Sequence, residues 1–234
     1  MKRYRIAGLL VDMEASGRTA QQAAAYASSE EGAADITVVC DLPKCRELNP
    51  EIEDMDILEH LVTGSVFSQK LLQYDGLLLH SSAVILEGKA YLFSAPSGMG
   101  KSTHTEKWCR LFGASYLNDD KPVLRLVDGV WYAYGTPWSG KHDLSQNVGV
   151  PLGAIAVLRR AEENSIRRMS PAEALPYFMS QSHYRHSREN MELQLSLTDK
   201  LLRQIPVWSL NCRNEDAAAV LSRDAMTGLC GSAI

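Results

Sequence analysis

Short blocks of apolar residues along the first 72 positions predict a small α/β unit. Residues 4–13 alternate loosely between apolar and polar side chains, which predicts a β-strand. Residues 19–27 are rich in Ala and Gln and predict a helix, whereas the β-branched residues 36–40 predict a second strand. Residues 43–54 carry Pro and several acids, which favours a surface connection. Residues 57–72 have helical spacing, and the stripe expected to be buried consists of Leu58, Leu61, Val62 and Val66.

From residue 75 onward the apolar runs become longer, and turn signals separate them. Residues 76–86 form an apolar run that is interrupted at 80–82. A turn signal at 87–89 leads into an apolar strand at 90–94, and the two runs together predict a β-hairpin. Residues 102–112 have helical spacing, and Gly113 supplies the expected C-terminal stop.

The remainder of the chain continues to alternate predicted strands and helices. Strands are expected at 115–117, 123–127, 130–134 and 154–158, and helices at 171–179 and 215–226. Asp128 and Gly129 form a hairpin signal between two of these strands. Residues 191–197 alternate as a strand would, but they lead into a helical stripe, so we interpret that segment as helix.

These elements predict the fold class and the organisation of the chain. Alternating strands and helices are typical of an α/β protein, and the hairpins imply a mixed rather than an all-parallel sheet. We expect residues 1–72 to be a small α/β lead-in packed on the core, and residues 73–234 to form the main domain.

Composition and charge narrow the choice of partners and compartment. The chain has 234 residues, 45% of them apolar, and a formal net charge of −4. That charge produces no basic field, so neither nucleic acid nor a membrane surface is an expected partner. The apolar run at residues 6–11 is too short for a secretion signal, and no run approaches 18 residues. Five cysteines, an odd number, are typical of a reducing compartment, and we expect a cytoplasmic protein.

The most specific motif lies between a predicted strand and a predicted helix. Gly98 and Gly100 allow backbone N–H groups to converge on phosphate oxygens, and the new helix adds its positive end. In such a loop Lys101 can reach the β- and γ-phosphates, and the Ser102 hydroxyl can hold Mg²⁺. Ala95 replaces the usual first glycine. The full segment reads Ala95, Pro96, Ser97, Gly98, Met99, Gly100, Lys101, Ser102 and Thr103.

Three further groups of residues are weaker candidates by themselves. Asp119 and Asp120 follow a short strand, where paired carboxylates suit metal binding and general-base chemistry, although adjacent acids are also common in plain turns. His80 sits in an apolar run, where a histidine is more often a core residue than a catalytic one. Residues 135–141 (GTPWSGK) form a shaped loop that can present Lys141 to a phosphate, or an ordinary surface turn.

Taken in order, these residues resemble the catalytic domain of HPr kinase/phosphorylase, which is similar in turn to the nucleotide-binding part of phosphoenolpyruvate carboxykinase. The resemblance rests on residues 79–84 (LHSSAV), 94–102 (SAPSGMGKS) and 118–120 (NDD), and extends to 135–141 and 150–164. The chain looks most like the short members of that family, which lack the N-terminal domain of the full bacterial kinase. The resemblance implies an α/β fold with a mixed sheet and a P-loop kinase core, and a homo-oligomer.

The resemblance also implies an ATP- and Mg²⁺-dependent transfer of a phosphoryl group to a serine hydroxyl of a protein or peptide. If the roles known for the family apply here, Asp119 is the base that takes the hydroxyl proton and His80 lies beside that aspartate. Asp120 and Ser102 would then hold the metal. Lys101 steadies the phosphates as both a catalytic and a nucleotide-binding residue. Either Arg159 or Arg160 can neutralise the transferring charge, although no motif decides between them. The expected nucleotide-binding residues are Ser97, Gly98, Met99, Gly100, Lys101, Ser102, Thr103 and Lys141.

The chain departs from that family in one respect that bears on its substrate. The Glu-Ile-Arg-Gly-Leu-Gly-type signature, tied to the phosphorylase reaction and to HPr handling, is missing from residues 135–147. This argues against HPr as the phosphoryl acceptor and against the reverse, phosphorylase reaction. A serine of a peptide is an equally open choice of acceptor. The alternatives are a nucleotide-binding regulatory module without catalysis and a small-molecule kinase. A carboxykinase-like enzyme would need an arginine set for its substrate that the sequence does not place.

Overall fold

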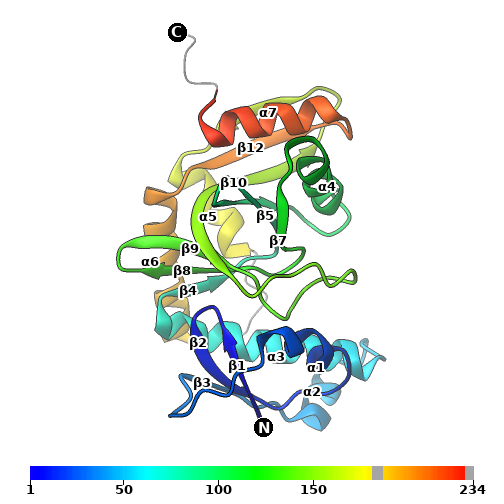
Figure 1. Ribbon diagram of the computed structural model, residues 1–234, viewed down its shortest axis with the longest axis vertical. Coiled ribbons are helices and arrows are strands. Elements are labelled where there is room, and N and C mark those ends of the chain that lie inside the picture. The colour runs from blue at the N-terminus through cyan, green and yellow to red at the C-terminus, as the bar shows by residue number, and fades with distance from the viewer. Residues whose placement is uncertain (181–186, 230–234) are drawn as a thin grey trace.

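The computed structural model describes residues 1–180 and 187–229, which form two β-sheets with flanking helices (Figure 1). Cys230, one of the five cysteines, lies outside the described residues. The N-terminal unit carries a three-stranded sheet of β1 (Lys2–Ile6), β2 (Leu9–Met13) and β3 (Ile36–Val38). Its helices are α1 (Gly17–Ala23), the 3₁₀ turn η1 (Ala24–Tyr26), α2 (Leu42–Leu48) and α3 (Met55–Leu71), which ends in a second 3₁₀ turn, η2 (Leu72–Tyr74).

The single strand predicted for residues 4–13 is wrong, because the segment is a hairpin. Ala7 and Gly8 both adopt positive φ, 51° and 78°, so the chain reverses between β1 and β2. Ala-Gly is a poor hairpin signal, so the loose alternation of residues 4–13 was interpreted as one continuous strand. The connection predicted for residues 43–54 is wrong in its first half, where α2 begins with Asp41 as N-cap and a Pro in its first turn.

The long helix predicted for residues 57–72 is confirmed as α3, but its buried face is rotated from the predicted one. Leu58 is buried, as predicted, whereas Leu61 is 41% exposed. Phe67 and Leu71 are fully buried instead, and small residues such as Gly64 lie on the same face. A Cβ on Gly64 would come within 3.0 Å of the Trp138 ring, so a side chain from the second half of the chain determines which face of α3 is covered.

The larger sheet has nine strands and is mixed, which confirms the predicted α/β fold class. The order is β4-β8-β9-β10-β6-β5-β7, with β12 pairing both β10 and β11. Pairs β10–β6 and β10–β12 are parallel, and the other pairs are antiparallel. The strands are β4 (Gly76–Leu78), β5 (Ser81–Leu86), β6 (Lys89–Ser94), β7 (Ser115–Asn118), β8 (Val123–Val127), β9 (Val130–Tyr134), β10 (Gly149–Arg160), β11 (Ser165–Arg168) and β12 (Val207–Cys212).

Strand β10 is much longer than the segment predicted at residues 154–158, and it joins two parts of the sheet. Residues 149–151 pair with β9, residues 152–157 with β6 and residues 155–160 with β12. The register with β6 shifts between Leu152 and Ala154, where the strand changes neighbours. Strands β11 and β12 were not predicted at all.

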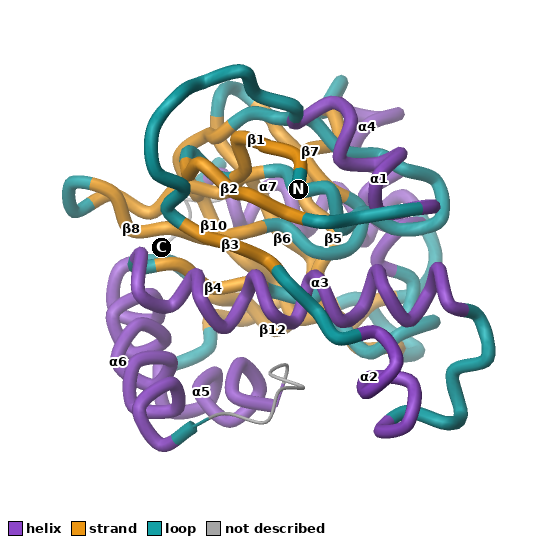
Figure 2. Tube along the Cα trace, turned by 90° about the horizontal axis from the view of Figure 1, so that it is seen from below, coloured by secondary structure: helices purple, strands orange, loops and turns teal. Residues whose placement is uncertain are grey.

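Helices cover both faces of the larger sheet (Figures 1 and 2). Along β6 the side chains of Ala90 and Leu92 face α5 (Pro171–Ser180) and α6 (Arg188–Gln204). Tyr91 and Phe93 alternate with them and face α4 (Lys101–Phe112) and α7 (Asp216–Thr227). All four helices lie close to the positions predicted for them.

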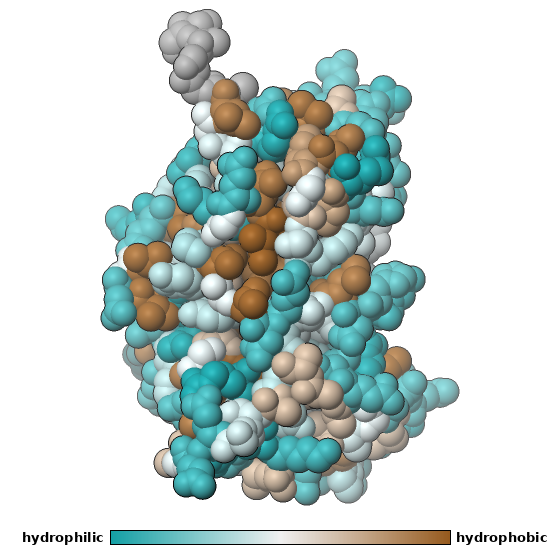
Figure 3. Space-filling view, in the orientation of Figure 1, coloured by the Kyte–Doolittle hydropathy of each residue, from teal (hydrophilic) through white to brown (hydrophobic). Residues whose placement is uncertain are grey.

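On the face seen in Figure 3, hydrophilic side chains surround a band of apolar ones near the middle of the molecule. Within residues 1–180 and 187–229, no helix has the length and apolar character needed to cross a membrane.

The N-terminal unit packs on the larger sheet through a core of its own. That core contains the buried apolar residues of β1, β2 and β3 together with Phe67, Leu71, Val123 and Trp138. The guanidinium of Arg125, on β8, donates to the carbonyl oxygen of Ala7 at 2.8 Å. Because Trp138 lies in the loop that follows β9, the N-terminal unit contacts that loop, next to the site described below.

Candidate functional site

The glycine-rich loop has the strand–loop–helix context that its sequence predicted. Strand β6 ends at Ser94, and α4 begins at Lys101. Gly98 and Gly100 adopt positive φ values of 76° and 96°, which a residue with a Cβ rarely accepts. Ser102 lies exposed in the first turn of α4. The loop therefore leaves the helix N-terminus, with its free backbone N–H groups, open to an anion.

Lys101 is the buried cation of this loop. Its side chain folds back along the loop, and Nζ donates to the carbonyl oxygen of Ala95 at 2.9 Å. The residue is only 8% exposed. Burial lowers the pKa of Lys101, and the negative charge of Asp120 acts in the opposite direction. Lys101 is therefore a basic side chain beside the loop with little water around it.

The acidic pair follows the end of β7 and is oriented by Asn118. The Asn118 Oδ1 accepts hydrogen bonds from the backbone N–H groups of Asp120 at 3.0 Å and Lys121 at 2.7 Å. The Asn118 Nδ2 donates to the carbonyl oxygen of Thr136 at 3.0 Å. The strand has therefore ended before the two acids, so the alternation of a strand no longer separates them. Both carboxylates line the same cleft as Lys101.

Asp119 is the more deeply buried acid of the pair. Its Oδ1 accepts a hydrogen bond from the backbone N–H of Gly140 at 2.6 Å. Burial raises the pKa of Asp119, and the N–H of Gly140 only partly offsets this effect. A Cβ on Gly140 would lie 2.8 Å from Oδ2 of Asp119, so this approach requires glycine. Asp119 is thus a carboxylate whose basicity is increased by its surroundings.

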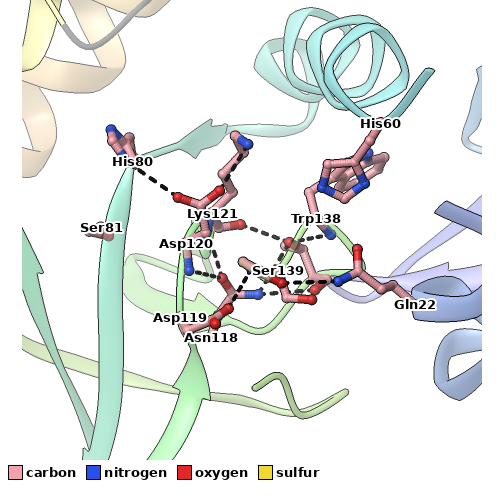
Figure 4. A network of polar contacts seen from close by, with 12 residues as sticks. Gln22, His60, His80, Ser81, Asn118, Asp119, Asp120, Lys121, Trp138 and Ser139 are labelled. Atoms are coloured by element: carbon pink, nitrogen blue, oxygen red, sulfur yellow. Dashed lines mark hydrogen bonds and ion pairs between the residues drawn. The ribbon is translucent and has the colours of Figure 1, made fainter. Parts of the chain in front are cut away.

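Asp120 has different partners, as Figure 4 shows. Its Oδ1 lies 3.2 Å from Nε2 of His80, and its Oδ2 accepts from Nζ of Lys121 at 3.0 Å. Burial acts to raise the pKa of Asp120, but the hydrogen bond from His80 and the charge of Lys121 outweigh it. The pKa of Asp120 therefore falls well below the usual range. The expectation that His80 lies beside Asp119 is wrong, because the histidine contacts the second acid.

His80 occupies the break between β4 and β5 rather than a position inside a strand. Its side chain is 25% exposed and lines the cleft, so it is not a core histidine. The two serines after it point elsewhere. Ser81 Oγ donates to the carbonyl oxygen of Leu79 at 3.2 Å, and Ser82 Oγ lies 3.1 Å from the Thr105 hydroxyl.

The loop of residues 135–141 is anchored at its centre and open at its end. Trp138 is fully buried, stacks on Phe67 with ring centroids 4.6 Å apart, and donates from Nε1 to the Thr63 hydroxyl at 3.1 Å. This anchor precedes Gly140, which holds Asp119, and Lys141, which is exposed and lines the cleft. The loop is therefore part of the site and not a plain surface turn.

These elements enclose a cleft of ≈ 560 Å³. Its lining includes His80, Ser97, Gly98, Gly100, Lys101, Ser102, Thr103, Asp119, Asp120 and Lys141, all of which the sequence had singled out. Gly140, from the predicted loop at residues 135–141, lines it as well, and two further lining residues were not indicated by the sequence, namely Arg18 and His142. No sequence signal could have placed Arg18 here, because it precedes the glycine-rich loop by about 80 positions and belongs to no motif.

A second cavity, of ≈ 360 Å³, also borders the glycine-rich loop. Gly98, Gly100 and Thr103 line both cavities. Met99 lines the second cavity and is not among the residues that line the first. The remaining lining of the second cavity combines apolar, amide and cationic side chains: His104, Lys107, Leu158, Arg160, Ala161, Cys212, Arg213 and Asn214.

Oxygen donors suited to a hard divalent cation are present in the first cleft. The Ser102 hydroxyl and the Asp120 carboxylate both line it, and Mg²⁺ prefers such ligands, usually few from the protein and the rest from phosphate and water. Among the residues that the structure describes, no group of three or more His, Cys, Asp or Glu side chains forms a metal cluster.

Fold and site together define a mixed α/β protein in which a glycine-rich loop, a buried lysine and an acidic pair share one cleft. The chain belongs to the family described as SynChlorMet cassette protein ScmC, whose model matches residues 38–215. No curated protein matches it. Among solved structures, the chain is similar to the Hpr(Ser) kinase/phosphatase from Coxiella burnetii, with 10% sequence identity and a TM-score of 0.40. That match covers 66% of this chain and 99% of the other. At this level the likeness is a distant one of fold, and it says nothing of activity.

Proposed function

We propose that this protein is an ATP- and Mg²⁺-dependent kinase that transfers the γ-phosphoryl group to a serine hydroxyl of a protein or peptide. The observation that supports this most directly is the convergence of Lys101, Asp119 and Asp120 on the cleft formed by the glycine-rich loop. Phosphoryl transfer needs positioning and charge neutralisation more than covalent chemistry by the protein, and these groups supply both.

The loop and Lys101 are suited to hold the triphosphate. Positive φ at Gly98 and Gly100 leaves the backbone without Cβ atoms where phosphate oxygens would approach. The N-terminus of α4 adds its partial positive charge. Lys101 exchanges its bond to the Ala95 carbonyl oxygen for phosphate oxygens, a stronger partner because both groups are then charged.

Asp120 and Ser102 are the residues that would hold Mg²⁺. A carboxyl group binds a metal in its ionised form, and the lowered pKa of Asp120 favours that form. When bound, Mg²⁺ supplies positive charge to the β- and γ-phosphate oxygens. His80 contacts Oδ1 of this carboxylate and Lys121 contacts Oδ2, and the two contacts fix its orientation.

Asp119 is the group that accepts the proton of the serine hydroxyl. Its Oδ1 is engaged by the Gly140 N–H, so Oδ2 is available to the hydroxyl. As the serine oxygen forms its bond to the γ-phosphorus, the bond to the bridging oxygen breaks and ADP leaves with the electron pair. The raised pKa of Asp119 makes it a better base than an exposed aspartate.

The second cavity is suited to the nucleoside part of ATP. It shares the glycine-rich loop with the first cleft, so a triphosphate lying across the loop places its base on this side. Met99 and Leu158 offer apolar surface to a ring, and the Asn214 amide offers hydrogen bonds to its edge. The guanidinium of Arg160, held by the Gly98 carbonyl oxygen at 2.7 Å, lies in the same cavity.

The test measures nucleotide binding and phosphoryl transfer separately. Mg-ATP affinity is measured by calorimetry, and transfer by ³²P incorporation into serine-containing peptides and by ADP release with water as acceptor. Lys101→Met should lose ATP affinity, and Asp119→Asn should keep it while turnover falls on the order of 10²–10⁴-fold, the usual contribution of a general base. Lys89→Met, at an exposed lysine outside the cleft, serves as the matched control.

Two outcomes would lead to other functions. Tight ATP binding with no turnover, unchanged in Asp119→Asn, would make the protein a nucleotide-binding regulatory module. Transfer to small hydroxyl compounds but not to peptides would make it a small-molecule kinase. Equal ATP affinity in wild type and Lys101→Met would refute the assignment of the loop.

The nucleoside cavity has its own test, which uses inorganic tripolyphosphate as a ligand without a base. ATP should bind more tightly than tripolyphosphate, and Ala161→Phe, which fills the cavity, should abolish only that difference. Ala172→Phe, at an exposed alanine of α5, controls for added bulk. Equal affinity of the wild type for the two ligands would exclude the second cavity as the base site.

A further inference from the structure

We propose that Arg18, which the N-terminal unit contributes to the cleft, contacts the phosphoryl group during its transfer. This inference rests on the proposed kinase function and adds to it a role for the first 72 residues. Arg18 also lies before the part of the chain that the family model matches, residues 38–215, so that match does not bear on it.

The environment of Arg18 is that of a cation without a fixed counter-charge. The residue is half-buried and lines the cleft together with Lys101, Ser102 and Asp119. Its Nη2 donates to the backbone carbonyl oxygen of Ser139 at 3.0 Å. Within the described part of the chain, Arg18 forms no ion pair with a carboxylate. A guanidinium has five N–H donors, so most of its donors remain available to an anion in the cleft.

The backbone that carries Arg18 is held rigidly. Both the N–H and the hydroxyl of Ser16 donate to the carboxylate of Glu59 on α3, the N–H at 2.5 Å. Gly17 has a φ of +42°, and a Cβ there would lie 2.3 Å from Oδ1 of Asp56. The first turn of α1 is therefore held against α3. A fixed backbone, together with the hydrogen bond from Nη2 to Ser139, places the cationic side chain at a defined position in the cleft.

The alternative arginines are placed elsewhere. The sequence had pointed to Arg159 or Arg160 for this role. Arg160 donates to the carbonyl oxygen of Gly98 and lines the second cavity rather than the first. Arg159 is exposed and is not among the residues that line the cleft of the acidic pair. Of the arginines in the described residues, Arg18 is the one that lines this cleft.

Phosphoryl transfer has a specific use for such a group. As the bond to the bridging oxygen breaks, charge spreads over the equatorial and leaving oxygens. Lys101 lies at the base of the loop, where it neutralises the phosphates in the ground state as well. Arg18 approaches from α1, and its planar fork can bond two of the developing oxygens at once. An arginine of this kind raises turnover on the order of 10³-fold or more in related chemistry.

The same residue also holds the loop at Ser139, so a purely structural role has to be separated from contact with the phosphoryl group. Gln22 supplies the comparison, because it lies on the same helix and its Nε2 donates to the Gly140 carbonyl oxygen at 3.2 Å. Gln22→Ala removes a tether of the same loop from the same helix without removing charge. Any effect that comes from loop positioning alone should appear in both variants.

The experiment measures turnover, ATP affinity and thermal unfolding for wild type, Arg18→Ala, Arg18→Lys and Gln22→Ala. We expect Arg18→Ala to lower turnover at least 100-fold and ATP affinity less than tenfold. Arg18→Lys, which keeps the charge but not the fork, should recover only part of the loss. Guanidinium ion at millimolar concentration should raise the turnover of Arg18→Ala severalfold and leave that of the wild type unchanged. Gln22→Ala should stay within about tenfold of wild type.

The results that overturn the proposal are distinct from those that overturn the kinase function. An active wild type with an equally active Arg18→Ala refutes a role for Arg18 alone. An equal loss of turnover in Arg18→Ala and Gln22→Ala, without rescue by guanidinium, assigns Arg18 to loop positioning and refutes contact with phosphate. A wild type with no turnover under any condition refutes both proposals together.

Discussion

Replacement of Trp138 tests whether this one side chain joins the N-terminal unit to the site. The indole is fully buried, stacks on Phe67 at 4.6 Å and donates to the Thr63 hydroxyl at 3.1 Å. Trp138→Ala removes these contacts and leaves a cavity against α3, and such changes cost about 3–5 kcal/mol of unfolding free energy. Typical domains have only about 5–15 kcal/mol in total, so the loss should be easy to measure.

Trp138→Phe divides this cost into its parts. Phenylalanine keeps a ring against Phe67 but cannot donate to Thr63. The Thr63 hydroxyl still donates to the Glu59 carbonyl oxygen at 2.8 Å, so it is not left without a partner. The loss should therefore be limited to one hydrogen bond and a small volume change, about 1–2 kcal/mol.

The assay is equilibrium unfolding in urea followed by far-ultraviolet circular dichroism, which does not depend on the tryptophan removed. The control is Trp208→Ala, because Trp208 is half-buried on β12 and its ring faces Arg168 rather than the N-terminal unit. Trp138→Ala should also lower turnover, since Gly140 and its bond to Asp119 lie two residues further on, whereas Trp208→Ala should not. A loss below 1 kcal/mol for Trp138→Ala would refute the role given to this anchor.

Three further changes have expected outcomes. Ser222→Ala should lower the unfolding free energy, measured by urea titration, by about 1–3 kcal/mol. The reason is that buried Trp108 Nε1 and His104 Nε2 each lose their hydrogen-bond partner at 2.9 Å. An unchanged unfolding free energy would contradict the packing of α4 on α7. Asp119→Asn should raise the unfolding free energy at pH 7, since burial raises the pKa of Asp119 and its ionised form opposes folding. That gain should shrink as the pH falls and vanish well below the ordinary Asp pKa of 3.8, where the acid is protonated in both states. A gain independent of pH would be inconsistent with this cause. Gly100→Ala should lower stability by about 1–2 kcal/mol and weaken ATP binding, because φ is +96°; unchanged calorimetric affinity would count against the loop geometry.

Local signals in the sequence were sufficient for much of the fold. The turn at Asp128 and Gly129 was predicted because both residues accept positive φ, at 49° and 81°. The end of α4 was predicted from Gly113, which has a φ of 70°. In both cases the determining interactions lie within a few residues along the chain, which is the range over which such patterns carry information.

The errors arose where distant segments decided the outcome. The buried face of α3 depends on Trp138, about 70 residues later in the chain, and no helical periodicity within α3 can include that ring. Strand β12 has two polar residues among its six, Ser209 and Asn211, and its parallel pairing with β10 came from the tertiary fold. The turn between β1 and β2 was missed because Ala7 takes a positive φ of 51°, which its residue type does not favour.

For the candidate site, the sequence by itself determined the chemical inventory: a glycine-rich loop with Lys101 and Ser102 between a strand and a helix, and two adjacent acids not far beyond it. Only the tertiary structure decided which partners the two acids have, because His80 and Lys121 contact Asp120 while Gly140 contacts Asp119. It alone brought Arg18 to the cleft, through a hydrogen bond to a residue 121 positions away. The physical reason is that residue types set which bonds are possible, whereas burial and the partners met across the fold set which of them form and what charge each group carries.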